Sequence, residues 1–266
     1  MIERDNKLCR RSEIQKGYLF YEASLKTFEF CTDQKPRQED ISSAHIWGLK
    51  IHAFAMRRSY SSEELKPRSG TDSISANEKR WSAIGICLNK ILLPTLRNAL
   101  EREFQDWYWH LTKPPIEIGK QVCGKHLKKL APSNISLQYE NINGNNVHKL
   151  KTSAYDYAVK DHLSLARLFV QPFMAKFTGF DDTMDLSASM IIMCEADPFV
   201  KCGAAAHAKR IRSEVRNEWA HGDFSTWTSA KFNNAIEEMQ GLVQSINLSD
   251  RVKKEVCDDL QKIRNK

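Results

Sequence analysis

One stretch of the chain, EVRNEWAHGDF at residues 214–224, combines side chains that can act together on a phosphodiester. Arg216 and Asn217 are adjacent, and His221 follows five positions after the arginine. An arginine binds phosphate through paired hydrogen bonds, an asparagine amide orients a hydroxyl or phosphate oxygen, and a histidine exchanges a proton near neutral pH. These abilities match RNA cleavage by the neighbouring ribose hydroxyl, which requires no metal. The alternative interpretation is that the three residues only solvate the end of a helix.

The element that must position these residues is a helix predicted over residues 204–221. Asn217 and His221 share one face as an i, i+4 pair, and Arg216 lies between that face and an apolar stripe. The stripe consists of residues that recur at helical spacing: Ala208, Ile211, Val215 and Trp219. Gly222 predicts the end of the helix, which places His221 at the negative end of the helix dipole, where a protonated imidazole is favoured.

Three more basic residues of this helix are candidates for RNA binding. Lys209 and Arg212 project on the side of Arg216, whereas Arg210 lies between Asn217 and His221. Lysine and arginine neutralise backbone phosphates, and so we predict that Lys209, Arg210 and Arg212 are RNA-binding residues. His207, on the same helix, is predicted to lie on the surface.

The whole chain is predicted to be all-α. Glycine (11) and proline (8) are scarce among 266 residues, and apolar residues recur every three or four positions. Residues 155–266 resemble an antiparallel helical bundle, and a helix at 77–112 is expected to pack on it. Residues 1–76 predict a basic, partly disordered N-terminal segment, because polar stretches with Pro and Ser interrupt them.

Local signals mark the ends of several helices. Ser75 and Glu78 form a capping-box pattern before the 77–112 helix, and Pro94 is expected to kink or break it. Ser225 or Thr226 is predicted to be the N-cap of the helix that follows the motif. The aromatic stretch FQDWYWH at residues 104–110 is expected to be mostly buried, with base stacking as the alternative.

Composition limits the classes of function. The net charge is +7, and the excess of positive charge lies in residues 1–130, which favours either an anionic partner or a solvated basic surface. The seven cysteines show no CxxC pair, so we expect neither a zinc site nor a cofactor. No secretory leader and no apolar run long enough for a membrane span is visible, and a cytoplasmic or nuclear location is expected.

The sequence VRNEWAHGDFSTWTSAKFNNAIEEMQGLV at residues 215–243 resembles the last two helices of HEPN domains, named for higher-eukaryote and prokaryote nucleotide binding. The hallmark of that superfamily is R-x4-6-H with a polar residue directly after the arginine, which maps onto Arg216, Asn217 and His221. The chain looks closest to two branches. One occurs in a RING-type ubiquitin ligase with a dishevelled-binding zinc finger, and the other is an animal family named for an X-chromosome open reading frame.

This resemblance implies an all-α bundle that forms a homodimer and brings two motifs into one cleft. Active members are metal-independent endoribonucleases that leave a 2′,3′-cyclic phosphate. By the resemblance His221 is the acid–base residue, Arg216 stabilises charge on the phosphorane, and Asn217 positions the reacting groups. The alternative is a non-catalytic interaction and dimerisation module in ubiquitin or innate-immune signalling.

Overall fold

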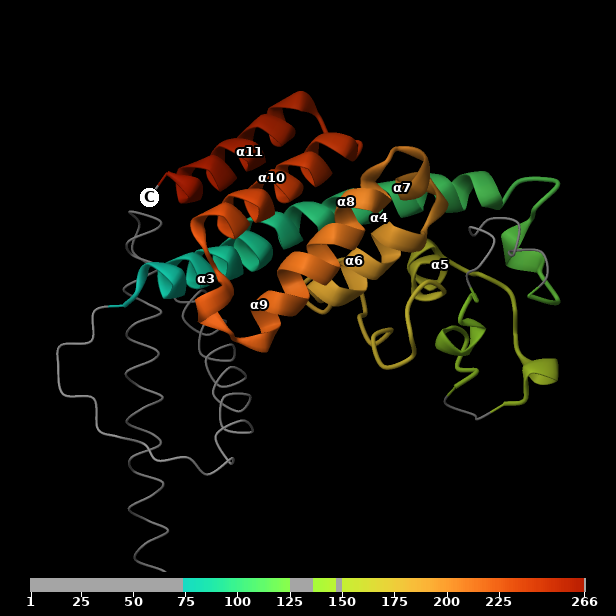
Figure 1. Cartoon of the computed structure of the whole chain (residues 1–266). Coiled ribbons are helices and arrows are strands. Elements are labelled where there is room, and N and C mark those ends of the chain that lie inside the picture. The colour runs from blue at the N-terminus through green and yellow to red at the C-terminus, as the bar shows by residue number, and fades with distance from the viewer. Residues whose placement is uncertain (1–73, 125–135, 147–149, 266) are drawn as a thin grey trace, which may run out of the picture. The chain divides into compact units, whose positions relative to one another are not determined.

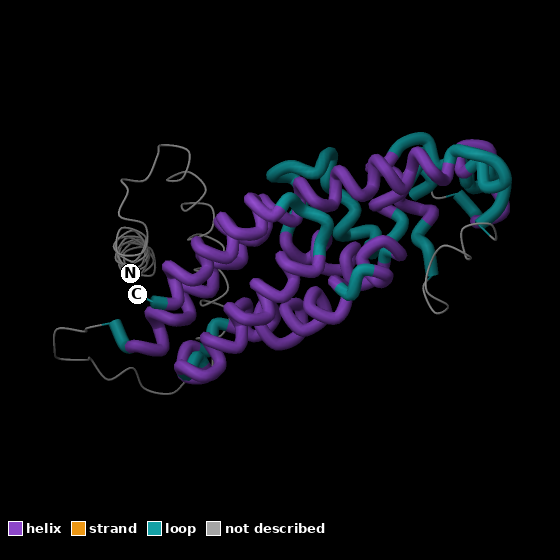
Figure 2. The backbone as a smooth tube through the Cα atoms, turned by 90° about the horizontal axis from the view of Figure 1, so that it is seen from above, coloured by secondary structure: helices purple, strands orange, loops and turns teal. Residues whose placement is uncertain are grey.

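The computed structural model describes residues 74–124, 136–146 and 150–265. Almost all of the predicted segment 1–76 lies outside these ranges. Every regular element of the described residues is a helix, and no strand occurs among them (Figure 2). The all-α prediction is therefore confirmed. No helix in these ranges is both long and apolar enough to cross a membrane.

The chain divides into two compact units. Of the described residues, the smaller unit contains 74–83 and 222–228, and the larger unit contains 84–221 and 229–265. Each unit has contacts of its own.

In the smaller unit, the start of helix α3 (Ala76–Ile86) lies beside the 3-10 turn Phe224–Thr226. The predicted capping box is confirmed, since Ser75 N donates to Glu78 Oε2 at 2.8 Å and Glu78 N donates to Ser75 Oγ at 3.2 Å. Trp81 packs edge-on against Phe224 with ring centroids 4.8 Å apart. This contact joins two segments that are far apart in the sequence.

The predicted N-cap at Ser225 or Thr226 is wrong. Helix α10 begins only at Ser229, and both residues belong to a separate 3-10 turn (Phe224–Thr226) whose N-cap is Asp223, with its Oδ1 accepting from Ser225 N at 3.1 Å.

In the larger unit, helical structure continues through a π-helical segment, Cys87–Leu92, into α4 (Leu93–Leu111). The helix does not break at Pro94. Pro94 lies in the first turn of α4, where a missing N–H costs little, and the expected disturbance takes the form of the π-helical segment directly before it.

Seven further described α-helices of the larger unit follow the irregular segment after α4. They are α5 (His162–Arg167), α6 (Leu186–Glu195), α7 (Asp197–Lys201), α8 (Ala204–Arg210), α9 (Asn217–His221), α10 (Ser229–Ser245) and α11 (Asp250–Arg264). Helix α8 packs on α6 and α10, α10 packs on α11, and α4 packs on α5 and α6 (Figure 1). Asp185 caps α6 by accepting from Ala188 N at 2.7 Å, and Ser249 caps α11.

Candidate functional site

The motif helix of residues 204–221 has three parts: α8, a π-helical turn (Ile211–Arg216) and α9 (Asn217–His221). Its predicted apolar stripe is buried, with exposed fractions of at most 7% at Ala208, Ile211, Val215 and Trp219. Gly222 has a φ of +71°, a left-handed conformation that glycine adopts without strain, and α9 ends directly before it. The stripe fixes which face of the helix carries the polar residues.

Trp219 anchors the last turn of this helix. Its indole lies against Gly85, and a Cβ atom at position 85 would come within 2.8 Å of Trp219 Cζ2. Only the missing side chain of Gly85 permits this approach. The contact fixes α9 against the helical segment that begins at Ile84.

Arg216 and Asn217 are in direct contact, because Arg216 Nη1 donates to Asn217 Oδ1 at 3.1 Å. Both side chains are half-buried, and His221 is exposed in the last position of α9. The arginine contacts a neutral amide, and no described carboxylate pairs with it. The predicted triplet therefore gathers at one end of one helix.

A row of cations leads along the helix to this triplet. Lys209 and Arg212 are exposed, and Arg216 continues the row at spacings of three and four residues. Residues three and four positions apart lie on the same side of a helix, and the π-helical turn that contains Arg212 and Arg216 preserves this relation. None of the three forms an ion pair with an acidic side chain of the described residues. We call Lys209, Arg212 and Arg216 the basic ridge.

Arg210, the third predicted RNA-binding residue, lies in different surroundings. Its Nε is 2.8 Å from Glu238 Oε1 on α10, and His207 Nδ1 is 2.7 Å from the other oxygen of the same carboxylate. His207 thus lies half-buried between two helices, at the surface but paired with Glu238. The structure does not bring Arg210 together with the basic ridge. The sequence does not predict Glu238 as the partner of Arg210, because the two residues are 28 positions apart and lie on different helices.

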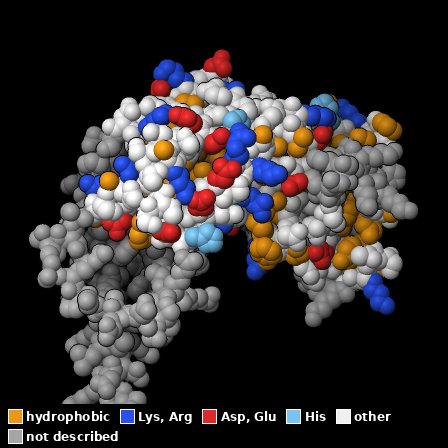
Figure 3. Space-filling model, viewed as in Figure 1, with side chains coloured by type: hydrophobic (Ala, Val, Ile, Leu, Met, Phe, Trp, Pro, Cys, Tyr) orange, Lys and Arg blue, Asp and Glu red, His pale blue; other side chains and the backbone are white. Residues whose placement is uncertain are grey.

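The side of the motif helix toward α10 is acidic. A hollow of about 360 Å³ lies there, and the described charged residues that line it are four glutamates and one lysine: Glu214, Glu218, Glu237, Glu238 and Lys231. Lys231 pairs with Glu218. Figure 3 shows acidic and basic side chains interspersed over the face of α8, α9 and α10. The excess of carboxylates in this hollow makes it unfavourable for a phosphate.

The aromatic stretch 104–110 is divided between core and surface. Phe104 is fully buried and contacts Phe169 and Phe199, as expected. Trp109 is 56% exposed, and Lys113 Nζ lies 3.2 Å from the centroid of its ring. In the described part of the chain, no group of three or more His, Cys, Asp or Glu side chains has an arrangement suited to a metal ion.

A comparison of the chain with protein-family models, with curated proteins and with solved structures finds no match. The HEPN resemblance rests on the motif residues and their spacing.

Proposed function

We propose that this protein binds RNA on the basic ridge and cleaves it, as a HEPN-type metal-independent endoribonuclease. The observation that supports the proposal is the row of three cations, none of which forms an ion pair with a described carboxylate, that leads to Asn217 and the exposed His221. A row of fixed positive charges attracts a phosphate backbone whatever its sequence. The end of this row then determines which phosphate of the RNA lies beside Arg216, Asn217 and His221.

The roles follow from the chemistry of each side chain. Arg216 donates two hydrogen bonds to the non-bridging oxygens of a phosphate and stabilises the charge of the pentacoordinate transition state. Asn217, already in contact with Arg216, orients the ribose 2′-hydroxyl. His221 exchanges the proton, and its exposure gives a substrate access to the imidazole. Attack by the 2′-oxygen on phosphorus expels the 5′-oxygen and leaves a 2′,3′-cyclic phosphate.

Cleavage moves two protons, one off the 2′-hydroxyl and one onto the leaving 5′-oxygen. The motif of one chain supplies a single imidazole, since His207 is engaged by Glu238. A second copy of the chain would supply the other proton-transfer group. The proposal therefore includes a homodimer in which two motifs face each other across one RNA strand.

The test incubates the full chain with mixed RNA in EDTA and identifies the ends of the products by mass spectrometry. We expect 2′,3′-cyclic phosphate ends, and a loss of at least about 100-fold in rate for His221→Ala. His110→Gln is the matched control, because His110 is also exposed but lies at the end of α4. Cleavage at an equal rate by wild type and His221→Ala would refute the catalytic role. Binding without cleavage would favour the non-catalytic module.

A further inference from the structure

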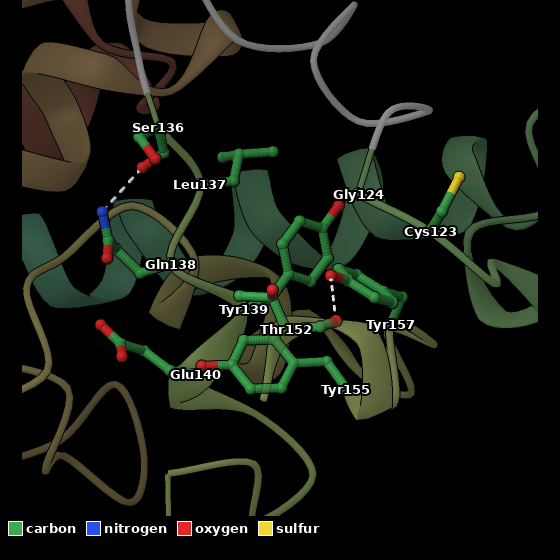
Figure 4. Close-up of a pocket in the computed structure, with 10 residues that line it drawn as sticks. All are labelled: Cys123, Gly124, Ser136, Leu137, Gln138, Tyr139, Glu140, Thr152, Tyr155 and Tyr157. Carbon is green, nitrogen blue, oxygen red and sulfur yellow. Dashed lines mark hydrogen bonds between the residues drawn. The ribbon is translucent and has the colours of Figure 1, made fainter. Parts of the chain in front are cut away.

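A second hollow of the larger unit, of about 490 Å³, lies among three tyrosines (Figure 4). Tyr139 belongs to the 3-10 turn Tyr139–Asn141, and Tyr155 and Tyr157 follow the 3-10 turn Thr152–Ala154. Alternate residues of an extended chain point to the same side, and so Tyr155 and Tyr157 both line the hollow. The two segments thus present three aromatic rings to one space.

The rings are tilted relative to one another. Tyr139 and Tyr157 have centroids 4.7 Å apart and planes at 66°, and Tyr155 and Tyr157 have centroids 6.0 Å apart and planes at 51°. Tyr139 and Tyr157 pack edge to face, so they cannot both stack on one flat nucleobase, whereas the faces of tilted rings can lie around a compact ion. A box of aromatic faces attracts a compact cation through the negative ring quadrupoles.

The lining of the hollow carries a negative charge, which attracts a cation. Glu140 is the one charged residue among the described residues that line the hollow, and its side chain is half-buried. None of the described lysines or arginines forms an ion pair with it. Its carboxylate repels phosphate and carboxylate ligands, which separates this hollow from the basic ridge in ligand chemistry.

One buried side chain fixes the walls of the box. Asn145 is 1% exposed, and its Nδ2 donates to the carbonyl oxygen of Tyr139 at 2.8 Å and to that of Asp156 at 3.1 Å. Its Oδ1 accepts from Asp156 N at 3.0 Å. Asp156 lies between Tyr155 and Tyr157, so a single amide ties both tyrosine segments together. The hydroxyl of Tyr157 donates to Thr152 O at 2.8 Å and fixes its ring.

We propose that the hollow lined by Tyr139, Tyr155, Tyr157 and Glu140 binds a methylated ammonium group. A trimethylammonium ion offers no N–H donor, and so it is recognised by aromatic faces and a nearby carboxylate rather than by hydrogen bonds. Choline and the side chain of trimethylated lysine both present this group. The site is independent of the Arg216 motif and of RNA cleavage.

The test uses the full chain and tetramethylammonium, whose methyl protons report binding through saturation transfer from the protein in NMR. Choline and trimethyl-lysine are measured in parallel and distinguish the two sources of the group. The neutral carbon isostere of choline, with a tert-butyl group in place of trimethylammonium, separates charge from shape. We expect the isostere to bind at least about fivefold more weakly than choline.

The matched variants are Tyr155→Leu, which removes the aromatic face, and Tyr155→Phe, which retains it. We expect about a fivefold or greater loss of affinity for the leucine variant and little change for the phenylalanine variant. Glu140→Gln is expected to weaken binding too. This variant still tests the site if Tyr155→Leu fails to fold. The proposal is overturned by an absence of binding to wild type, by equal affinity for the neutral isostere, or by unchanged affinity in Glu140→Gln.

Discussion

Two arginines of the motif helix, two positions apart, have different surroundings and therefore different expected roles. Arg210 shares the carboxylate of Glu238 with His207, whereas Arg212 is exposed and has no acidic partner among the described residues. A phosphate that binds Arg210 must first displace Glu238. A phosphate that binds Arg212 displaces only water.

This difference predicts that Arg212→Ala mainly lowers RNA affinity, whereas Arg210→Ala mainly lowers the stability of the fold. Arg212→Ala should lower RNA affinity by about 1 kcal/mol and reduce the dependence of log K on log salt by about 0.7, as expected for one lost contact with single-stranded RNA. Arg210→Ala should leave RNA affinity almost unchanged. It should instead lower the free energy of unfolding by up to about 1 kcal/mol, because its ion pair is partly exposed.

Fluorescence titrations at several salt concentrations and urea unfolding of both variants measure these quantities. Lys254→Ala serves as a control for the loss of one positive charge, since Lys254 is exposed on α11 and already paired with Asp258. Equal losses of RNA affinity in Arg210→Ala and Arg212→Ala would show that the ridge has no special part in binding.

At the scale of elements, the position of α9 depends on a contact that reverses an ordinary helix preference. Replacement of a glycine inside a helix by alanine usually stabilises the helix by up to about 1 kcal/mol. At Gly85 the new methyl group would instead overlap Trp219, whose indole atoms lie 2.8–3.0 Å from the Cβ position. Because Trp219 is 7% exposed, the ring has little room to move away.

We therefore expect Gly85→Ala to lower the free energy of unfolding by about 1–3 kcal/mol and to displace α9 with Asn217 and His221. Urea unfolding measures the first effect, and amide NMR shifts of residues 217–221 measure the second. Gly119→Ala is the control, since a Cβ atom at position 119 would lie 3.6 Å from Val159 O, an ordinary van der Waals distance. An unchanged or increased stability of Gly85→Ala would mean that Trp219 does not anchor the motif helix.

The elements also show which features a sequence can predict. The capping box at Ser75 and Glu78, the end of α9 at Gly222 and the buried stripe depend on residues within a few positions of one another, and all three are confirmed. The π-helical turn and the partner of Arg210 depend on tertiary contacts, and such contacts produce no periodic pattern in the sequence. The tyrosine hollow was missed for the same reason, because Asn145 assembles it through long-range bonds to backbone atoms.

At the scale of the whole molecule, the net charge of +7 cannot by itself explain selective RNA cleavage. A diffuse positive charge increases the rate of encounter and the salt dependence, but it moves no proton. Proton transfer needs groups at fixed positions, and the motif of one chain offers one accessible imidazole. The proposed activity consequently depends on how many copies of the chain meet.

This dependence predicts that cleavage activity per chain rises with chain concentration and levels off when the dimer is fully formed. Initial rates over a dilution series, compared with sedimentation velocity at the same concentrations, test the link. Mixing inactive His221→Ala with wild type adds a control: excess variant should depress the activity of wild type, because mixed dimers lack one imidazole. Constant activity per chain, over a range in which sedimentation shows only monomer, would restrict the reaction to one copy and require a second proton-transfer group within the same chain.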